Sequence, residues 1–477
     1  MTEKDCLLGN VGSFEHRLLL DINYKSSLEL YFHNLSAKIE KTTKLQIPEV
    51  VDKTKQNILD ILYRNTLMAE ILESKDFLEI LEQEKQLRGE VKVGVVQCID
   101  GRLSIPHQFG RATNVKEIAG SLIKLNEDGE TISDRRFEGI LEQTANEGRE
   151  LLQIVTGHTS LKDEDHRCGR IMKGVKEKEF TGEVNQVAWE EAEKRAIAIE
   201  NEYNDILQAK GKTPQAKVAI TAMIDTDTMG LIFSFGQANS LSTTELTREL
   251  TTEIQQALGE ETGGFGSMKD TFADPFHFIE YSEHVLKITE FLTKRLATDS
   301  KFKQYITVNF PELTSSQKQA LLFTIGRTIA NQYITGLASE EEFTHPYLLH
   351  SEEYMVVSPH GKPLGGFDLR QSFGSVPADR GEMLIHVLTK LSLLDKQKAE
   401  KPYILFFSTP VNKVVYDHQD ITLVGVEDAA KVYFLELFKD EEIKKRVYEG
   451  SLVIIPILID ESNRRPLEIR DYSIFLN

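Results

Sequence analysis

Cysteine, tryptophan and long apolar runs are scarce in this chain, and its 56 basic residues are outnumbered by 75 acidic ones. Its 477 residues include three cysteines and one tryptophan. No apolar run approaches the roughly 20 residues that span a bilayer. The first residues carry neither a basic start nor an apolar signal segment, so we expect a cytoplasmic protein without a disulfide between Cys98 and Cys168. The net charge of −19 argues against nonspecific binding to nucleic acid or to anionic membranes.

The pattern of apolar residues predicts an α/β fold in three parts. Residues 1–88 carry apolar side chains at helical spacing and predict an N-terminal helical domain. Residues 89–348 alternate strands with amphipathic helices, which is typical of a mostly parallel sheet flanked by helices. We expect this second part to be the catalytic domain.

The third part, 349–477, repeats the same order of elements without any cysteine. It predicts strands over 353–358, 402–408 and 451–459 that alternate with helices at about 380–395 and 426–447. This order is consistent with a degenerate second copy of the catalytic fold that lacks zinc ligands. An unrelated α/β domain is the alternative, because the pattern is common.

Two apolar, β-branched segments end in side chains that bind soft metals. The first segment ends in Cys98 and the second in His158, and Cys168 follows after a charged loop. Buried parallel strands place ligands at their carboxyl ends, and these ends lie at one edge of the sheet. Two thiolates and one imidazole suit Zn²⁺ and leave the fourth tetrahedral position open. The sequence therefore predicts a catalytic zinc site at Cys98, His158 and Cys168.

An aspartate and an arginine follow the first of these ligands. Asp100 and Arg102 lie two and four residues past Cys98, in the loop that leaves the strand. A free carboxylate this close can coordinate the metal, and a bidentate contact from Arg102 would hold Asp100 away from it. We therefore expect Asp100 and Arg102 to be catalytic, with Asp100 accepting a proton from water on the metal.

These motifs together resemble the β-class carbonic anhydrases. The resemblance lies in Cys98-x-Asp100-x-Arg102, Gly157-His158 and Cys168-Gly169. The nine residues between His158 and Cys168 are similar to the long interval of the carboxysome shell carbonic anhydrases, a divergent branch of this class. The segment 224–228, Ile-Asp-Thr-Asp-Thr, and the length of the chain also resemble that branch.

The resemblance implies a zinc-dependent carbonic anhydrase, a lyase that reversibly hydrates carbon dioxide to bicarbonate by means of zinc-bound hydroxide. It implies a β-carbonic-anhydrase-like sheet, Zn²⁺ as cofactor, a degenerate second copy and a homodimer. A protein shell is a further partner on the same grounds. The shell enzymes carry a long basic N-terminal extension that this sequence does not show, so the cytoplasm is favoured over a carboxysome.

Several alternatives stay open. His166 competes with His158 as the ligand, although it follows a charged run, and a closed structural zinc site would use both histidines. Asp225 and Asp227 follow a strand, where we expect a turn or a helix cap rather than a catalytic role. The alternative functions are a zinc hydrolase of carbon disulfide or carbonyl sulfide, and a non-enzymatic shell or scaffold protein with a vestigial site.

Overall fold

The computed structural model divides the chain into two compact units. We call residues 76–271 and 277–349 the central unit, and residues 1–75, 272–276 and 350–477 the terminal unit. The structure describes residues 27, 30, 33, 48–98, 114–117, 135–162, 164, 167–259, 275–336, 354–357, 372–375, 384, 387, 388, 391, 402–412, 417, 421–460 and 465–471. None of the helices in this part of the chain is long and apolar enough to cross a membrane.

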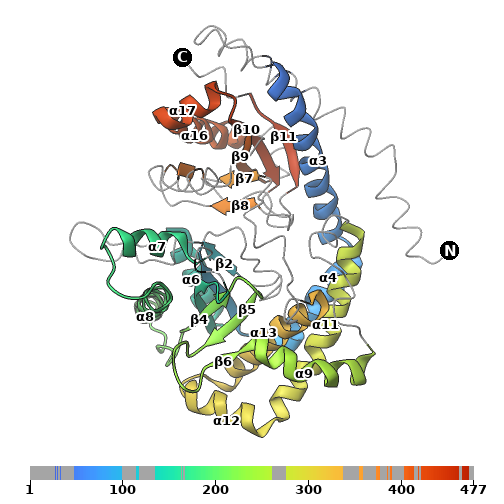
Figure 1. Ribbon diagram of the computed structural model, residues 1–477, viewed down its shortest axis with the longest axis vertical. Coiled ribbons are helices and arrows are strands. Elements are labelled where there is room, and N and C mark those ends of the chain that lie inside the picture. The colour runs from blue at the N-terminus through green and yellow to red at the C-terminus, as the bar shows by residue number, and fades with distance from the viewer. Residues whose placement is uncertain are drawn as a thin grey trace, which may run out of the picture. The chain divides into compact units, whose positions relative to one another are not determined.

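A mostly parallel sheet forms the middle of the central unit (Figure 1). Its strands occur in the order β2-β1-β3-β4-β5-β6. The first four are parallel to one another, whereas β5 and β6 pair antiparallel. The bounds are β1 Lys92–Gln97, β2 Asn114–Glu117, β3 Leu151–Thr159, β4 Ala219–Asp225, β5 Gly230–Phe233 and β6 Leu241–Ser242. Every residue of β3 is buried, as expected of a strand with parallel neighbours on both sides.

Helices cover this sheet and supply its core. Val96 and Val155 of the sheet pack in one cluster with Leu141 of α6 and with Ala192 and Ile199 of α8. On α13, a buried ion pair joins Arg327 to Glu84 of α4. The helices are α4 Lys75–Arg88, α6 Arg135–Glu147, α7 Gly169–Lys176, α8 Val184–Ala209, α9 Thr243–Leu258, α11 Pro275–Thr298, α12 Ser300–Asn309 and α13 Ser315–Thr335.

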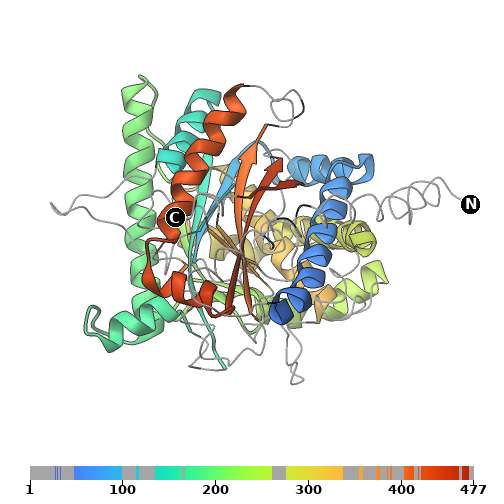
Figure 2. The ribbon, with the colours of Figure 1, turned by 90° about the horizontal axis from the view of Figure 1, so that it is seen from above.

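The terminal unit has a five-stranded sheet of the order β11-β10-β9-β7-β8. Four strands are parallel, and β11 is antiparallel to β10. The bounds are β7 Tyr354–Val357, β8 Ser372–Ser375, β9 Tyr403–Val411, β10 Leu452–Asp460 and β11 Pro466–Ile469, with the helices α3 Pro48–Leu72, α16 Ile421–Leu437 and α17 Glu441–Tyr448. In both ribbon views α3 and α16 lie on opposite sides of β9 and β10 (Figures 1 and 2). The prediction of an α/β protein with a mostly parallel sheet between helices is confirmed.

The predicted N-terminal helical segment is divided between the two units. The apolar side of α3 packs into the core of the terminal unit, where Ile58 and Leu62 join one cluster with Phe406 and Ile455. Almost all of α4 belongs instead to the central unit. Helical periodicity shows that a helix has an apolar side, but it does not show which core that side enters.

One predicted helix is two helices in the structure. The sequence predicts a single helix at about 426–447, whereas α16 ends at Leu437 and α17 begins at Glu441. Asp440 caps α17, because its carboxylate accepts hydrogen bonds from the backbone N–H groups of Glu442 and Ile443 at 2.9 and 3.0 Å. An aspartate that binds free N–H groups in this way marks a helix start that apolar periodicity does not reveal.

Candidate metal centre

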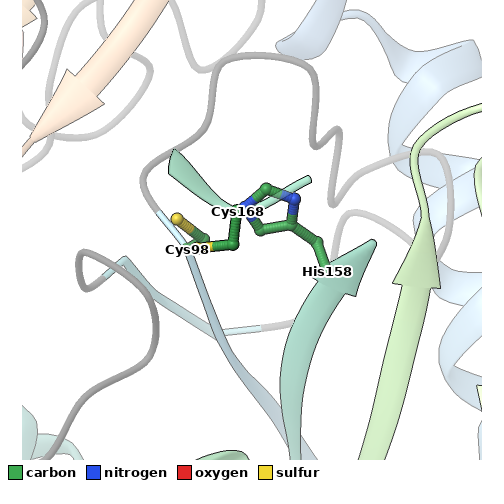
Figure 3. A group of neighbouring side chains, drawn as sticks. All are labelled: Cys98, His158 and Cys168. Atoms are coloured by element: carbon green, nitrogen blue, oxygen red, sulfur yellow. The ribbon is translucent and has the colours of Figure 1, made fainter. Parts of the chain in front are cut away.

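The three predicted ligands lie together in the central unit. The ligand atoms of Cys98, His158 and Cys168 are all within 4.8 Å of one another. Their side chains are almost fully buried, with exposed fractions of 6%, 1% and 1% respectively. Figure 3 shows the imidazole of His158 directed from the end of its strand toward the two thiols. The two cysteines are free thiols rather than a disulfide.

Sheet geometry brings the first two ligands together. Cys98 directly follows β1, and His158 is the penultimate residue of β3, which pairs in parallel with β1. The carboxyl ends of neighbouring parallel strands meet at the same edge of the sheet. The residue before the histidine also contributes, because a side chain at Gly157 would lie 2.8 Å from the backbone oxygen of Ala188. Glycine therefore allows β3 to approach α8 closely where it presents His158.

Helix α7 positions the third ligand. Cys168 is its N-cap residue, and its backbone oxygen accepts the first helical hydrogen bond from Met172 N–H at 2.9 Å. The partial positive charge at a helix N-terminus favours a thiolate over a thiol. Arg170, in the first turn of the helix, adds a full positive charge. The hydrogen bonds that Arg170 donates to the Glu179 carboxylate raise the pKa of Arg170, and the nearby charge of Cys168 contributes in the same direction.

The loop from His158 to Cys168 is fixed at its two ends. At the start, Thr159 Oγ1 donates a hydrogen bond to Asn185 Oδ1 at 2.6 Å. At the end, Arg167 donates to Glu183 at 2.8 Å, and the same Glu183 carboxylate caps α8 by accepting from Asn185 N–H at 2.9 Å. The N-terminus of α8 thus serves as a common support for both ends of the ligand loop.

Asp225 and Asp227 lie beside this loop. Asp225 ends β4, opposite Thr159 in the register of β3 and β4, and Asp227 follows in the turn to β5. Both are buried, and burial together with the negative charge of Asp227 raises the pKa of Asp225 to about 6. The expectation of a turn is confirmed. Their contacts to a segment more than 60 residues away in sequence were missed, because no local pattern reports such contacts.

The donor set fits a zinc ion. In a tetrahedral site with bonds of about 2.0 Å to nitrogen and 2.3 Å to sulfur, ligand atoms lie roughly 3.6 to 3.8 Å apart, so small side-chain movements would complete the site. Two thiolates and an imidazole are ligands that zinc prefers over magnesium or calcium. In the part of the chain that the structure describes, no fourth His, Cys, Asp or Glu joins the group. A buried group that can hold a metal ion is therefore present.

Three of the predicted site residues lie outside the described residues. They are Asp100, Arg102 and the alternative ligand His166. Their roles stay predictions from the sequence. The position of His158 beside both cysteines shows that a three-ligand set does not require His166.

Comparison with known proteins does not assign the chain to a family. No protein-family model matches it, and no curated protein matches it. The metal centre is therefore described by its own geometry, together with the motifs in the sequence.

Proposed function

We propose that the chain is a zinc-dependent carbonic anhydrase that reversibly hydrates carbon dioxide to bicarbonate. The observation that carries this proposal is the convergence of Cys98, His158 and Cys168 at the carboxyl edge of a parallel sheet, with no fourth protein ligand among the described residues. A zinc ion bound there would lower the pKa of a water molecule and supply hydroxide near neutral pH. The open fourth position is what separates such a site from a purely structural one.

The residues of the chain have separate roles in this proposal. The thiolates of Cys98 and Cys168 neutralise the charge of the ion, so a nearby base is needed to take the proton. Asp100 is suited to accept that proton, two residues past a ligand. Arg102 would hold the Asp100 carboxylate by a bidentate contact and prevent it from closing the site. The burial of Cys98, His158 and Cys168 would strengthen their electrostatic attraction to a bound ion.

We further propose that the terminal unit is a degenerate copy of the central one. Strand orders β2-β1-β3-β4-β5 and β8-β7-β9-β10-β11 are equivalent, with four parallel strands and one antiparallel strand in each. No group of zinc ligands occurs in the second set among the described residues, since β9 ends in Ser408-Thr409-Pro410-Val411, and no cysteine occurs after Cys168 in the sequence. By the resemblance to β-class enzymes we also propose a homodimer, which light scattering on the purified chain would test.

Two measurements on the purified full chain test the activity. Metal analysis should find about one zinc per chain, and stopped-flow measurement with a pH indicator should detect rapid hydration of carbon dioxide. Zinc bound at this stoichiometry without hydration would overturn the proposed activity. In that case carbon disulfide and carbonyl sulfide are the next substrates to assay, and a scaffold with a vestigial site would bind zinc but turn over none of the three.

A further inference from the structure

A buried carboxylate holds the beginning of the loop that joins two of the metal ligands. The hydroxyl of Ser160 donates to both carboxylate oxygens of Asp227, at 2.9 and 3.0 Å. The backbone N–H of Lys162 donates to the same carboxylate at 2.8 Å. Ser160 and Asp227 have exposed fractions of 0% and 7%, so solvent does not compete for these hydrogen bonds. The contact lies two residues past His158 in the chain.

Hydrogen bonding, rather than apolar packing, fixes this segment. Leu161, between the two donors, is 60% exposed, and Lys162 is exposed as well. The neighbouring Asp225 adds only a long contact, from the backbone N–H of Leu161 at 3.4 Å. An exposed loop without apolar anchors keeps one conformation only where specific polar contacts hold it. Asp227 accepts the two shortest of the hydrogen bonds that the 160–162 segment donates to these carboxylates.

The turn that carries Asp227 is itself rigidly held. Thr228 Oγ1 donates to Asp225 at 2.7 Å, and Gln332 of α13 donates to the backbone oxygen of Thr228 at 3.0 Å. Met229 is buried and has a backbone φ of +55°, in the left-handed region that residues other than glycine rarely adopt. Such a conformation persists only where the surroundings determine it strongly. The turn is therefore a fixed point to which the ligand loop is attached.

We propose that Asp227 is a positioning residue of the metal centre. By holding residues 160–162 it fixes the direction in which the chain leaves His158, and hence the approach of Cys168 to the same ion. Asp227 is not a member of the group of side chains that could hold the metal ion. The inference rests on the proposed binding of zinc by Cys98, His158 and Cys168, but it does not depend on which reaction the site catalyses. Residues that orient ligands from outside typically contribute roughly 10- to 100-fold to metal affinity.

Two substitutions of Asp227 separate its hydrogen bonds from its charge. Asp227→Ala leaves both donors without their acceptor, so zinc affinity should fall by roughly 10- to 100-fold. Asp227→Asn should restore most of it, because an amide accepts from Lys162 N–H through Oδ1 and donates to Ser160 Oγ through Nδ2. Zinc affinity of the full chain is measured by competition with a chromophoric chelator. Cobalt(II) loaded in place of zinc gives absorption bands whose intensity reports the ligand geometry.

A third variant and a control complete the design. Ser160→Ala removes only the side-chain donor and should give a smaller loss than Asp227→Ala, which keeps the test valid if the latter variant does not fold. Thr324→Val on α13 removes another buried hydroxyl of the same unit, which bonds to Ala320 O at 2.9 Å, and should leave zinc affinity unchanged. A loss of affinity in Thr324→Val equal to that in Asp227→Ala would show general destabilisation and overturn the inference.

The outcomes distinguish this inference from the proposed function. Wild-type affinity and an unchanged cobalt spectrum in Asp227→Ala overturn the positioning role while leaving carbonic anhydrase activity intact. A wild-type chain that binds zinc without hydrating carbon dioxide overturns the activity, while the weaker zinc binding of Asp227→Ala still supports the positioning role. A wild-type chain that binds no zinc through Cys98, His158 and Cys168 overturns both.

Discussion

The two sheets of this protein share a strand order but differ at the edge where parallel sheets carry their sites. In the central unit, β1 leads directly into Cys98 and β3 ends in Gly157-His158-Thr159. In the terminal unit, Ser358 follows β7 in the sequence and β9 ends in hydroxyl and apolar residues. The topology brings strand ends together in both units, but soft donor atoms occur at that edge in the central unit alone among the described residues.

Both sheets combine an apolar cluster with buried polar residues at their strand ends. The terminal sheet packs Phe406 and Phe407 with Ile454 and Ile455 in one continuous apolar cluster. The central unit buries Ser160, Asp225 and Asp227 beside the ligand loop, and the terminal sheet buries Ser408, Thr409 and Asp460 at the ends of β9 and β10. Buried polar groups are costly unless they are paired, and those beside the ligand loop are paired with one another across the loop and the turn. We therefore expect the apolar cluster of the terminal sheet to contribute stability, and the polar residues beside the ligand loop to be tolerated because they are hydrogen-bonded.

Replacing one of the three predicted metal ligands should have the largest effect, because these side chains distinguish the sheet edge of the central unit from that of the terminal unit. Cys168→Ser replaces a thiolate by a hydroxyl that zinc binds weakly, so the chain should lose most of its metal and all hydration activity. The matched control is Cys6→Ser, which removes the one cysteine outside the ligand set. It should retain full zinc by metal analysis and wild-type turnover by stopped flow. Normal zinc content in Cys168→Ser would mean that the metal is held elsewhere.

Removing Arg102, the predicted partner of the Asp100 carboxylate, should lower activity strongly without removing the metal. In Arg102→Ala the Asp100 carboxylate loses its bidentate partner and is free to occupy the open coordination position. Turnover should fall roughly 100-fold or more, the scale of a lost acid–base group, while zinc content stays near that of the wild type. Arg248→Ala, on the exposed side of α9, is the control and should leave both quantities unchanged. Equal loss of zinc and activity in Arg102→Ala would contradict the assigned role.

A core substitution in the terminal sheet should affect stability but not zinc. Phe406→Ala empties a fully buried position of β9 and should lower the free energy of unfolding by roughly 3–5 kcal/mol in chemical denaturation. Val424→Ala on α16, where the side chain is 55% exposed, should change it by less than about 0.5 kcal/mol. Under conditions where both variants remain folded, each should bind one zinc per chain. Loss of zinc from folded Phe406→Ala would show that the metal centre depends on the terminal core.

Sequence reasoning located the strands of the central sheet, because an apolar, β-branched run is a local property of the sequence. The β-branched runs of β1 and β3 indicate burial directly, and Cys98 and His158, which lie at the carboxyl ends of these strands, come together with Cys168 in the structure. The partner of α3 was not predictable, since amphipathic spacing leaves open which core accepts the helix. Nor was the role of Asp227, whose hydrogen bonds connect positions 65 and 67 residues apart in the chain.

The smallest expected effect concerns the protonation of the buried Asp225. The folded-state pKa of Asp225, about 6, exceeds its ordinary value of 3.8, mainly because burial penalises the ionised form and also because Asp227 is close. Between these values the folded state binds more protons than the unfolded state, so this group makes stability fall as pH rises from about 4 to 6. The metal-free Asp225→Asn variant should not lose stability in this way, because an amide at position 225 does not ionise. Relative to wild type, its free energy of unfolding should rise across that window by up to about 3 kcal/mol.

Asp299 provides a control of opposite sign for this titration. The backbone hydrogen bond from Phe302, followed by the contact with Arg295, lowers the pKa of Asp299. Its ionised form stabilises the fold, and this stabilisation is lost as pH falls through the folded pKa. Asp299→Asn should therefore become less stable relative to wild type as pH rises, whereas Asp225→Asn becomes more stable. Denaturation curves of the chelator-treated chains between pH 4 and 7 measure both slopes. Parallel slopes for Asp225→Asn and wild type would show that Asp225 does not impose this pH dependence on the central unit.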